Sequence, residues 1–299
     1  MNNNSILIEK QNSFKIIKST FLTALIVWKS YKGTLIFFVI LSIVFAMLPI
    51  FMGRALGGVN YRDYFAENGG STHPEAFLIL GTNTWSLISY ALWDYATYTR
   101  EEQQQGTLES LFLTPANQGL IVVGRGLVSL VMAVGTFIVG VLIGLLIFDP
   151  ALLFSLDFPI FLFSLVLVTL SFLPLLGMSM GLGAFIIRFK EVSNILSSIQ
   201  MFLGTLMGVF FPITILPFTV QIISALFPGT WVAQDIRYVV TGSPPMAMIL
   251  GLSNVLGTIP IIYDFIALIV LTLVWTLAGG FIFSWTLNRI KQQQGLSEY

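Results

Sequence analysis

Residues 126–148 read GLVSLVMAVGTFIVGVLIGLLIF, an apolar run that contains no Asp, Glu, Lys or Arg. A helix needs about 20 consecutive apolar residues to cross the hydrocarbon core of a bilayer, so this run is long enough to span a membrane. The whole chain has the same character, because 56% of its 299 residues are hydrophobic and only 9% are charged. Soluble domains usually carry about 25% charged residues. The sequence therefore predicts an all-α integral membrane protein.

The same criterion predicts six transmembrane helices along the chain. One of them, 158–187, is longer than a single straight span requires. Pro174 and the glycines at 177, 181 and 183 favour one kinked helix there over two spans. The six predicted spans are 33–52, 76–98, 126–148, 158–187, 192–211 and 265–287.

The uncharged stretch 192–234 has the length of two spans, but three prolines argue against a second one. Pro212, Pro217 and Pro228 leave only 218–227 uninterrupted between the last two, which is about 15 Å of helix, or half a bilayer. We expect 192–211 to cross the membrane and the following segment to form a re-entrant hairpin on one side. Such a broken backbone is tolerated where protein or a cavity surrounds it. A seventh span at 245–262 is the alternative.

Basic residues are distributed unevenly over the two sides of this six-span arrangement. Eleven Lys and Arg lie before the first span and in the loops and tail on the same side, against three on the opposite side. Cytoplasmic loops are enriched in basic residues, so both termini are predicted to be cytoplasmic in a multi-pass protein of the cell membrane. Residues 1–32 are predicted to include an interfacial helix, 33–291 to form the six-span domain, and 292–299 to form a tail. A soluble lead-in is the alternative for 1–32.

Composition excludes several kinds of site. The chain has no cysteine, which removes disulfides, thiol catalysis and thiolate metal sites. Its single histidine, His73, leaves no histidine cluster and is expected to be solvated in the first outer loop. A net charge of zero argues against a nucleic-acid surface. No G-x-x-x-x-G-K-S/T loop occurs, so we expect no ATPase, no catalytic residues, no metal and no cofactor on this chain.

The segment between spans two and three is the longest polar insertion on the cytoplasmic side. Gly106 and Thr107 can open a short helix there, and Pro115 ends it. An apolar stripe and acidic flanks on such a helix favour docking into the groove of another protein, and a helix lying back on the membrane is the alternative. The stripe is Leu108, Leu111 and Phe112, and the acidic residues are Glu101, Glu102 and Glu109.

Residues 100–115, REEQQQGTLESLFLTP, resemble the signature of ABC-2 type exporter permeases, in which Arg and Glu precede G-T-L-E-x-L-x-x-S/T-P. Two further stretches resemble the same family. The segment 211–237, with its proline pairs and Asp-Ile-Arg, is similar to the family's outer re-entrant segment, and the ending QGLSEY at 294–299 is similar to its G-x-L-x-x-Y tail. This chain departs from the family at two places. Residues 103–105 are less charged than in many members of the family, and residues 244–260 form a longer and more apolar segment.

The resemblance implies a fold, partners and functional segments. It implies the ABC-2 (type V exporter) fold, a homodimer or heterodimer of permeases in the bilayer, and a separate ATP-binding subunit that holds ATP and Mg. It also implies an outer gate or re-entrant segment with Pro212, Pro217, Pro228, Asp235 and Arg237. The implied ATPase-coupling segment comprises Arg100, Glu101, Glu102, Gly106, Thr107, Leu108, Glu109, Leu111, Phe112 and Pro115.

Individual charged residues near the membrane allow more than one interpretation. Asp235 and Arg237 either line the outer gate or form an ion pair on the external surface. Asp264 is expected to mark the boundary of the last span. Asp94 either reaches the headgroups, pairs with Arg100, or has a functional role inside the membrane.

The leading hypothesis is the permease subunit of an ATP-driven exporter that moves an amphipathic drug, antibiotic, peptide or lipid-like molecule. A polysaccharide or envelope-glycolipid exporter is the alternative within the same superfamily, and an aromatic-lined channel would favour it. An ion-coupled secondary transporter would show inverted repeats and several charged residues at mid-membrane, and the sequence shows neither. A membrane scaffold without transport activity is a further alternative.

Overall fold

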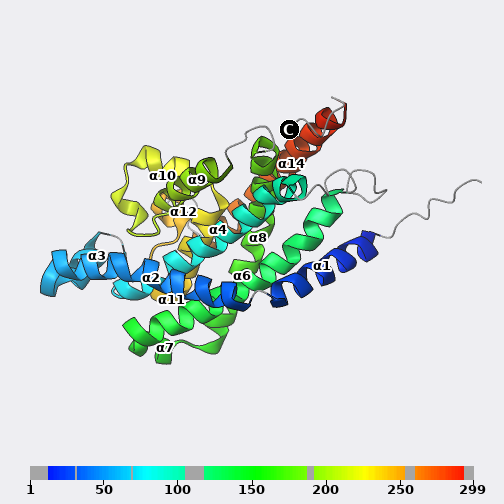
Figure 1. Cartoon of the computed structure of the whole chain (residues 1–299). Coiled ribbons are helices and arrows are strands. Elements are labelled where there is room, and N and C mark those ends of the chain that lie inside the picture. The colour runs from blue at the N-terminus through cyan, green and yellow to red at the C-terminus, as the bar shows by residue number, and fades with distance from the viewer. Residues whose placement is uncertain are drawn as a thin grey trace, which may run out of the picture.

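The computed structural model describes residues 13–30, 32–68, 70–104, 118–186, 192–252 and 260–292. Within these residues all regular structure is helical (Figure 1). The elements are α1 (Ser13–Ser30), α2 (Lys32–Gly57), η1 (Gly58–Asn60), α3 (Tyr61–Glu67), α4 (Pro74–Gln104), α6 (Gln118–Phe148), α7 (Pro150–Ser155), α8 (Phe158–Ile186), α9 (Val192–Leu206), η2 (Ile213–Ile215), α10 (Phe218–Ala225), α11 (Pro228–Thr241), α12 (Met246–Ile249) and α14 (Pro260–Gln292).

Four helical stretches in the described residues are long and apolar enough to cross a membrane. They overlap four of the predicted spans, 33–52, 126–148, 158–187 and 265–287, and they support a multi-pass membrane protein. The prediction that 158–187 is one helix is confirmed, since α8 continues through Pro174. The four stretches are Val39–Glu67, Val123–Phe148, Phe158–Ala184 and Ile261–Thr286.

Helix α4 covers the predicted 76–98 span and continues beyond both of its ends. It is more polar than those four stretches and carries Thr82, Asn83 and Thr84, which are buried. These side chains bond to carbonyls of their own helix, with Thr82 Oγ1 2.9 Å from the Leu78 oxygen and Asn83 Nδ2 2.9 Å from the Ile79 oxygen. A helix can bury such side chains because the donor atom of each is hydrogen-bonded to a carbonyl of the preceding turn.

The predicted span 192–211 is wrong at its C-terminal end. Helix α9 has 15 residues and stops at Leu206, which gives about 22 Å of helix. The chain then turns at Gly208, whose φ of 61° lies in the left-handed region. Glycine adopts this conformation without the steric penalty of a Cβ atom. Thus α9 is shorter than the 30 Å or so of a hydrocarbon core.

Helices α8 and α14 approach each other closely at two glycines. A Cβ atom at Gly177 would lie 2.5 Å from the Cα of Thr276, and one at Gly279 would overlap the Gly177 carbonyl oxygen. Small residues at such a crossing let two backbones touch, a common way for membrane helices to associate. Because a side chain on either glycine would separate the helices, this crossing fixes how the last span packs.

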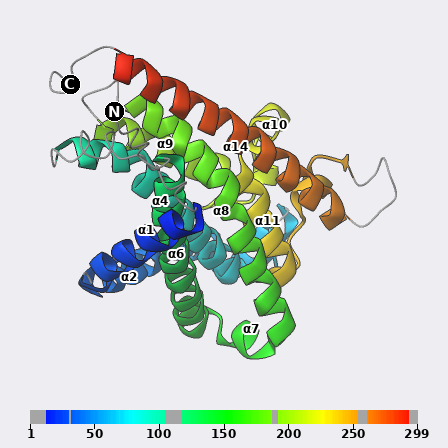
Figure 2. The same ribbon diagram turned by 90° about the vertical axis from the view of Figure 1, so that its right-hand side faces the viewer.

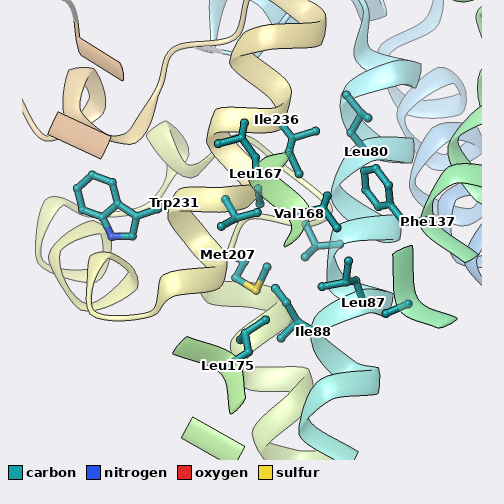
Figure 3. Packing of buried hydrophobic residues seen from close by; sticks show 14 of the residues in the cluster. Leu80, Leu87, Ile88, Phe137, Leu167, Val168, Leu175, Met207, Trp231 and Ile236 are labelled. Carbon is teal, nitrogen blue, oxygen red and sulfur yellow. The ribbon is translucent and has the colours of Figure 1, made fainter. Parts of the chain in front are cut away.

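Buried apolar side chains gather around α4. Figure 3 shows Leu80, Leu87 and Ile88 of α4 facing side chains of α6, α8 and α11. Phe137 of α6 and Trp231 of α11 belong to the same cluster. Helix α4 is therefore the central helix of the bundle, which explains why it can carry more polar residues than the helices around it.

A helix occupies part of the N-terminal region in which an interfacial helix is predicted. Helix α1 packs against α6, where a Cβ at Gly124 would lie 2.8 Å from the Ile17 carbonyl oxygen. Phe14 and Ile26 on other parts of its surface are largely exposed. The start of α1 and the end of α14 lie toward one end of the bundle, and α3 lies toward the other (Figure 1). Figure 2 shows α1 beside α6. A position in the membrane interface stays a prediction.

Candidate functional site

The predicted ATPase-coupling segment begins on α4. Arg100, Glu101 and Glu102 lie in the last turns of this helix, so the C-terminal end of predicted span two runs without a break into the signature. The remaining residues of the segment lie outside the described residues, as do the side-chain positions of the three charged residues. They are Gly106, Thr107, Leu108, Glu109, Leu111, Phe112 and Pro115.

The proline-rich segment after α9 forms three short helical elements. Pro212 directly precedes η2, Pro217 directly precedes α10, and Pro228 is the first residue of α11. Proline suits these positions because it lacks an N–H that a helix start would leave unpaired. The stretch 218–227 contains only the eight-residue helix α10, so the expected break in the backbone is present. Its location on the outer side of a membrane stays a prediction.

Arg237 of α11 is fully buried and bonds to backbone carbonyls. Its Nε donates to the Phe77 oxygen at 3.2 Å, and its Nη2 donates to the Gly208 and Val209 oxygens at 3.0 and 3.2 Å. The guanidinium carbon also lies 3.7 Å from the centre of the Phe77 ring, a cation–π contact. Arg237 therefore joins α11 to the start of α4 and to the turn that ends α9.

The alternative of a surface ion pair between Asp235 and Arg237 is wrong. Both side chains have an exposed fraction of 0%, and no ion pair links them in the described part of the chain. Residues two apart on a helix point to different faces, which explains the separation. Whether the two residues line an outer gate stays a prediction.

Asp264 is also buried, and its expected position at the boundary of the last span stays a prediction. It lies on α14, and its two carboxylate oxygens accept hydrogen bonds from the backbone N–H groups of Met246 at 2.9 Å and Ala247 at 2.8 Å. These N–H groups begin the four-residue helix α12. Asp264 thus fixes the segment after α11 to α14. The described part of 245–262 contains α12 and the first residues of α14, and the alternative of a seventh span there stays a prediction.

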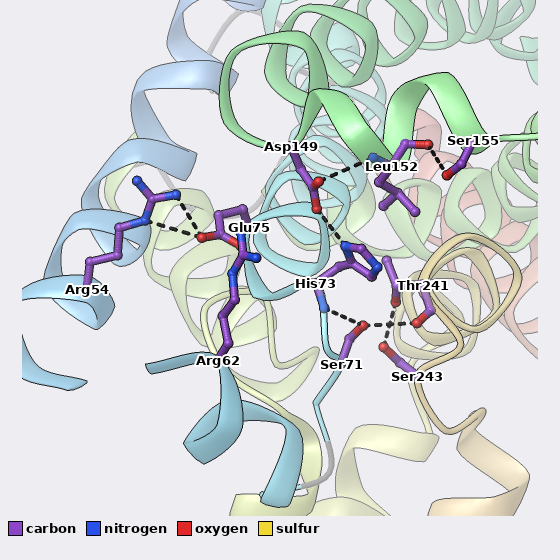
Figure 4. A network of polar contacts seen from close by, with 10 residues as sticks. All are labelled: Arg54, Arg62, Ser71, His73, Glu75, Asp149, Leu152, Ser155, Thr241 and Ser243. Atoms are coloured by element: carbon purple, nitrogen blue, oxygen red, sulfur yellow. Dashed lines mark hydrogen bonds and ion pairs between the residues drawn. The ribbon is translucent and has the colours of Figure 1, made fainter. Parts of the chain in front are cut away.

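Two arginines converge on a buried glutamate near the end of the bundle that carries α3 (Figure 4). Glu75 of α4 is 1% exposed, and its Oε1 accepts from Arg54 Nη2 at 2.8 Å and Nε at 3.2 Å. Arg62 Nη2 lies 3.5 Å from the other carboxylate oxygen. Burying a carboxylate is unfavourable unless opposite charges or hydrogen-bond donors pair with it. Because the two arginines that pair with Glu75 come from α2 and α3, this cluster holds both helices against α4.

His73 is not merely solvated, as the sequence suggested. Its Nδ1 lies 2.8 Å from Asp149 Oδ2, and its backbone N–H donates to Ser71 Oγ at 3.1 Å (Figure 4). Asp149 Oδ1 accepts from the Leu152 N–H, so Asp149 is the N-cap of α7. The Ser71 hydroxyl donates to the Thr241 carbonyl at 2.9 Å. The network connects the start of α4 with α7 and with the end of α11.

An apolar groove of about 620 Å³ lies between α2 and α6. The one hydroxyl in its lining belongs to Thr136 and donates to the Met132 and Ala133 carbonyls, so no free polar group faces the groove. A Cβ at Gly135 would meet nothing within 4 Å, so this glycine leaves the groove open. The lining is Ile36, Val39, Ile40, Ile43, Val131, Met132, Gly135, Thr136, Val139 and Ile143.

Sequence reasoning missed Glu75, Asp149 and the buried position of Asp264. Asp149-Pro150 was a readable signal, because Asp before Pro is a typical helix start. No comparable signal pairs Glu75 with Arg54 and Arg62, which lie on other helices.

No protein-family model matches the chain, and no curated protein matches it at a significant level. The family resemblance of residues 100–115 therefore stays a prediction.

Proposed function

We propose that this chain is the membrane-spanning permease subunit of an ATP-driven exporter of the ABC-2 type. It would work as a homodimer or heterodimer with a separate ATP-binding subunit that carries ATP and Mg. The proposal places six spans in the cell membrane, with α4 and the shortened α9 added to the four long apolar helices. Both termini would then be cytoplasmic.

The observation that carries the proposal is the run GTLESLFLTP at 106–115, with Arg and Glu before it. It follows directly from α4, which is the central helix of the bundle. A push on this run by a partner ATPase would therefore act on the helix that contacts α2, α6, α8 and α11. Coupling requires such a connection between the ATP-binding subunit and the transmembrane helices.

The groove between α2 and α6 supports an amphipathic or lipid-like substrate over a polysaccharide. Its lining is aliphatic, apart from a glycine, a methionine and a threonine whose hydroxyl is already bonded. Sugars need hydrogen-bonding groups and aromatic platforms, and this groove offers neither. A hydrocarbon portion of a substrate would find a compatible surface there.

The test of the proposal targets the apolar stripe of the coupling segment. The full-length tagged chain, purified from its own cells, should bring down an ATPase with a P-loop. Leu108→Asp and Leu111→Asp should each abolish this co-purification, because losing one buried anchor costs ~2 kcal/mol or more, or about thirtyfold in affinity. Glu109→Lys is the control, and it should reduce the amount of co-purified ATPase less than the two leucine substitutions do. This reduction should be larger at low salt, because salt screens a charge at the rim of an interface.

Membrane insertion of each variant is measured in parallel by fractionation. If Leu108→Asp and Leu111→Asp both retain the ATPase and insert normally, residues 106–115 are not the coupling segment. Failure of the native chain to bring down any P-loop ATPase would remove the main support for the exporter.

The buried charges of α11 and α14 favour a second candidate function. Asp235, Arg237 and Asp264 are all fully buried, and ion-coupled transporters place charged residues inside the bundle. The two candidates differ in their energy source. Transport by the second would stop when an ionophore collapses the ion gradient and would continue after ATP is depleted.

A further inference from the structure

The groove between α2 and α6 is open toward the outside of the bundle. Ile36, Ile40 and Val131 of its lining are exposed, and both helices contribute to the stretches that are long and apolar enough to cross a membrane. In a membrane protein the medium against such a surface is lipid hydrocarbon. The walls of an empty groove would lose dispersion contacts, so a volume of about 620 Å³ favours an apolar occupant.

The length of the groove matches one leaflet of a bilayer. Its lining on α6 runs from Val131 to Ile143, which corresponds to about 18 Å of helix. One leaflet contributes roughly 15 Å of hydrocarbon, half of the core. An acyl chain is the part of a lipid that extends over this distance. Gly135 lies in the middle of this run and leaves room for the chain, because a Cβ atom there would meet nothing within 4 Å.

Helix α1 supplies positive charge beyond one end of the groove. It packs on α6 at Gly124, where Ile17 makes the contact, and Gly124 precedes Val131 by about 10 Å along the helix. Lys15 and Lys18, on either side of Ile17, are exposed. No ion pair joins them to another residue in the described part of the chain. The two ammonium groups can therefore pair with the phosphate group of a lipid whose acyl chain enters the groove.

An apolar stripe on α1 connects the lysines with the start of α2. Lys18, Leu22 and Ile26 follow one another at intervals of four residues, so they are neighbours along one side of the helix. Leu22 and Ile26 are exposed, and the chain continues from α1 into α2, whose Ile36 lines the groove. Cation, apolar stripe and groove thus follow the order of headgroup and acyl chain in a phospholipid.

We propose that this groove binds one acyl chain of an anionic phospholipid whose phosphate group lies at Lys15 and Lys18. Lysine suits this role because its apolar stem can cover apolar surface while its ammonium reaches the headgroup. The inference concerns a lipid of the surrounding bilayer and does not rest on the exporter proposal. A transported molecule that used the groove would have to displace this lipid.

Binding is measured with two phospholipids that share their acyl chains. The full-length protein is reconstituted into vesicles of equal parts phosphatidylglycerol and phosphatidylcholine and extracted in mild detergent. Native mass spectrometry then counts the phospholipids that stay bound, and we expect one tightly retained molecule per chain. Phosphatidylglycerol should be enriched roughly 25-fold over phosphatidylcholine, because each of the two lysines contributes about fivefold near an anionic headgroup.

Substitutions separate the groove from the lysines. Gly135→Leu fills the middle of the groove and should reduce the retained phospholipid by roughly tenfold or more, since losing the burial of two methylene groups already costs about that factor. Val139→Phe, at an exposed position of the lining, should have the same effect and is the second variant if the first impairs folding. The double variant Lys15→Gln with Lys18→Gln should keep the lipid but bring the ratio of the two headgroups close to one.

Two controls lie on α14. Gly280→Leu adds the same side chain at a position where a Cβ also meets nothing within 4 Å, and Arg289→Gln removes another exposed cation. Both should retain the lipid and the headgroup ratio of the native protein. The proposal is overturned if Gly135→Leu and Val139→Phe retain phospholipid at the native level, or if the lysine variant keeps the native ratio.

Size-exclusion chromatography of the same samples tests a second occupant. If the groove variants changed the oligomeric state and left the bound lipid unchanged, a second copy of the chain would occupy the groove, and the lipid proposal would be wrong. None of these measurements needs the ATP-binding subunit or a transport assay. Their failure is therefore distinguishable from a failure of the exporter proposal.

Discussion

Gly81 of α4 leaves the space that the guanidinium of Arg237 occupies. A Cβ atom at Gly81 would overlap Arg237 Nη2 and would lie 2.7 Å from the carbonyl oxygen of Val209, to which that nitrogen donates. Three segments distant in the sequence thus meet at one buried cation. They are α4, the turn after α9, and α11.

Gly81→Ala should destabilise this junction. The added methyl group has no room beside the guanidinium, and overpacking of a buried site costs about 1–3 kcal/mol. We expect a lower apparent Tm for the full-length protein in detergent. Gly135→Ala is the matched control, because nothing lies within 4 Å of its Cβ position. A Gly81→Ala protein as stable as the Gly135→Ala protein would contradict the position of Arg237.

Arg237→Lys should also lower stability, although the charge is kept. An ammonium on a flexible stem cannot reproduce the planar set of donors that reaches the Phe77, Gly208 and Val209 carbonyls. Charged hydrogen bonds contribute about 1.5–3 kcal/mol each, so we expect a loss of at least ~2 kcal/mol in a denaturant titration. Arg62→Lys serves as the comparison, since that side chain is 58% exposed, and its stability should be nearly native.

Two adjacent glycines on α14 offer a sharper comparison. A Cβ at Gly279 would overlap the Gly177 carbonyl oxygen of α8, whereas a Cβ at Gly280 would meet nothing within 4 Å. Gly279→Ala should therefore separate the helices and lower the apparent Tm, and Gly280→Ala should leave it unchanged or raise it slightly through better helix propensity. Thermal unfolding of both variants followed by size-exclusion fluorescence measures the difference. A reversed order would rule out the glycine crossing.

The long helices could be predicted from the sequence because each depends on local composition. The runs 126–148 and 158–187 end within one residue of α6 and α8 at their C-termini. An apolar run in lipid has few alternatives to a helix, since every backbone group must be paired internally. The three prolines likewise marked the starts of η2, α10 and α11, because proline acts on its own position in the backbone.

The end of α9 and the buried charges could not be predicted, because they depend on residues far apart in the sequence. Val192–Gln234 is uncharged, and nothing in it shows that the helix stops at Leu206. The stop involves Gly208, whose carbonyl accepts from Arg237. In the same way, the proximity of Asp235 and Arg237 in the sequence suggested a surface pair, whereas both side chains are buried and Arg237 bonds to carbonyls of α4 and of the turn after α9.

Asp149 allows its two roles to be separated by substitution. Asp149→Asn keeps an oxygen that can cap α7 but removes the charge that faces His73, whereas Asp149→Ala removes both. Replacing an N-cap by Ala costs about 1 kcal/mol, so Asp149→Ala should be the less stable variant in a urea titration. If Asp149→Asn lost as much stability as Asp149→Ala, the contact with His73 and not the cap would dominate.

The six-span arrangement predicts opposite accessibility for sites at the two ends of the bundle. The chain has no cysteine, so single cysteines can be introduced without background labelling. Glu67→Cys at the end of α3 and Ile222→Cys on α10 replace exposed side chains, and both should react with an impermeant maleimide on intact cells. Ser5→Cys and Glu298→Cys should react only after lysis, because the positions of eleven of the fourteen basic residues predict cytoplasmic termini.

Ile222 is the decisive site of the four. If the segment from Pro212 to Thr241 returns to the outer side, α10 lies on the same side of the membrane as α3. The chain reaches that side only if α9, the predicted span directly before this segment, crosses the membrane. Helix α9 is only 15 residues long and is followed by the turn at Gly208, whose carbonyl accepts from the buried Arg237. Labelling of Ile222→Cys only after lysis, with Glu67→Cys still labelled from outside, would show that α9 does not cross. The six-span arrangement would then be wrong.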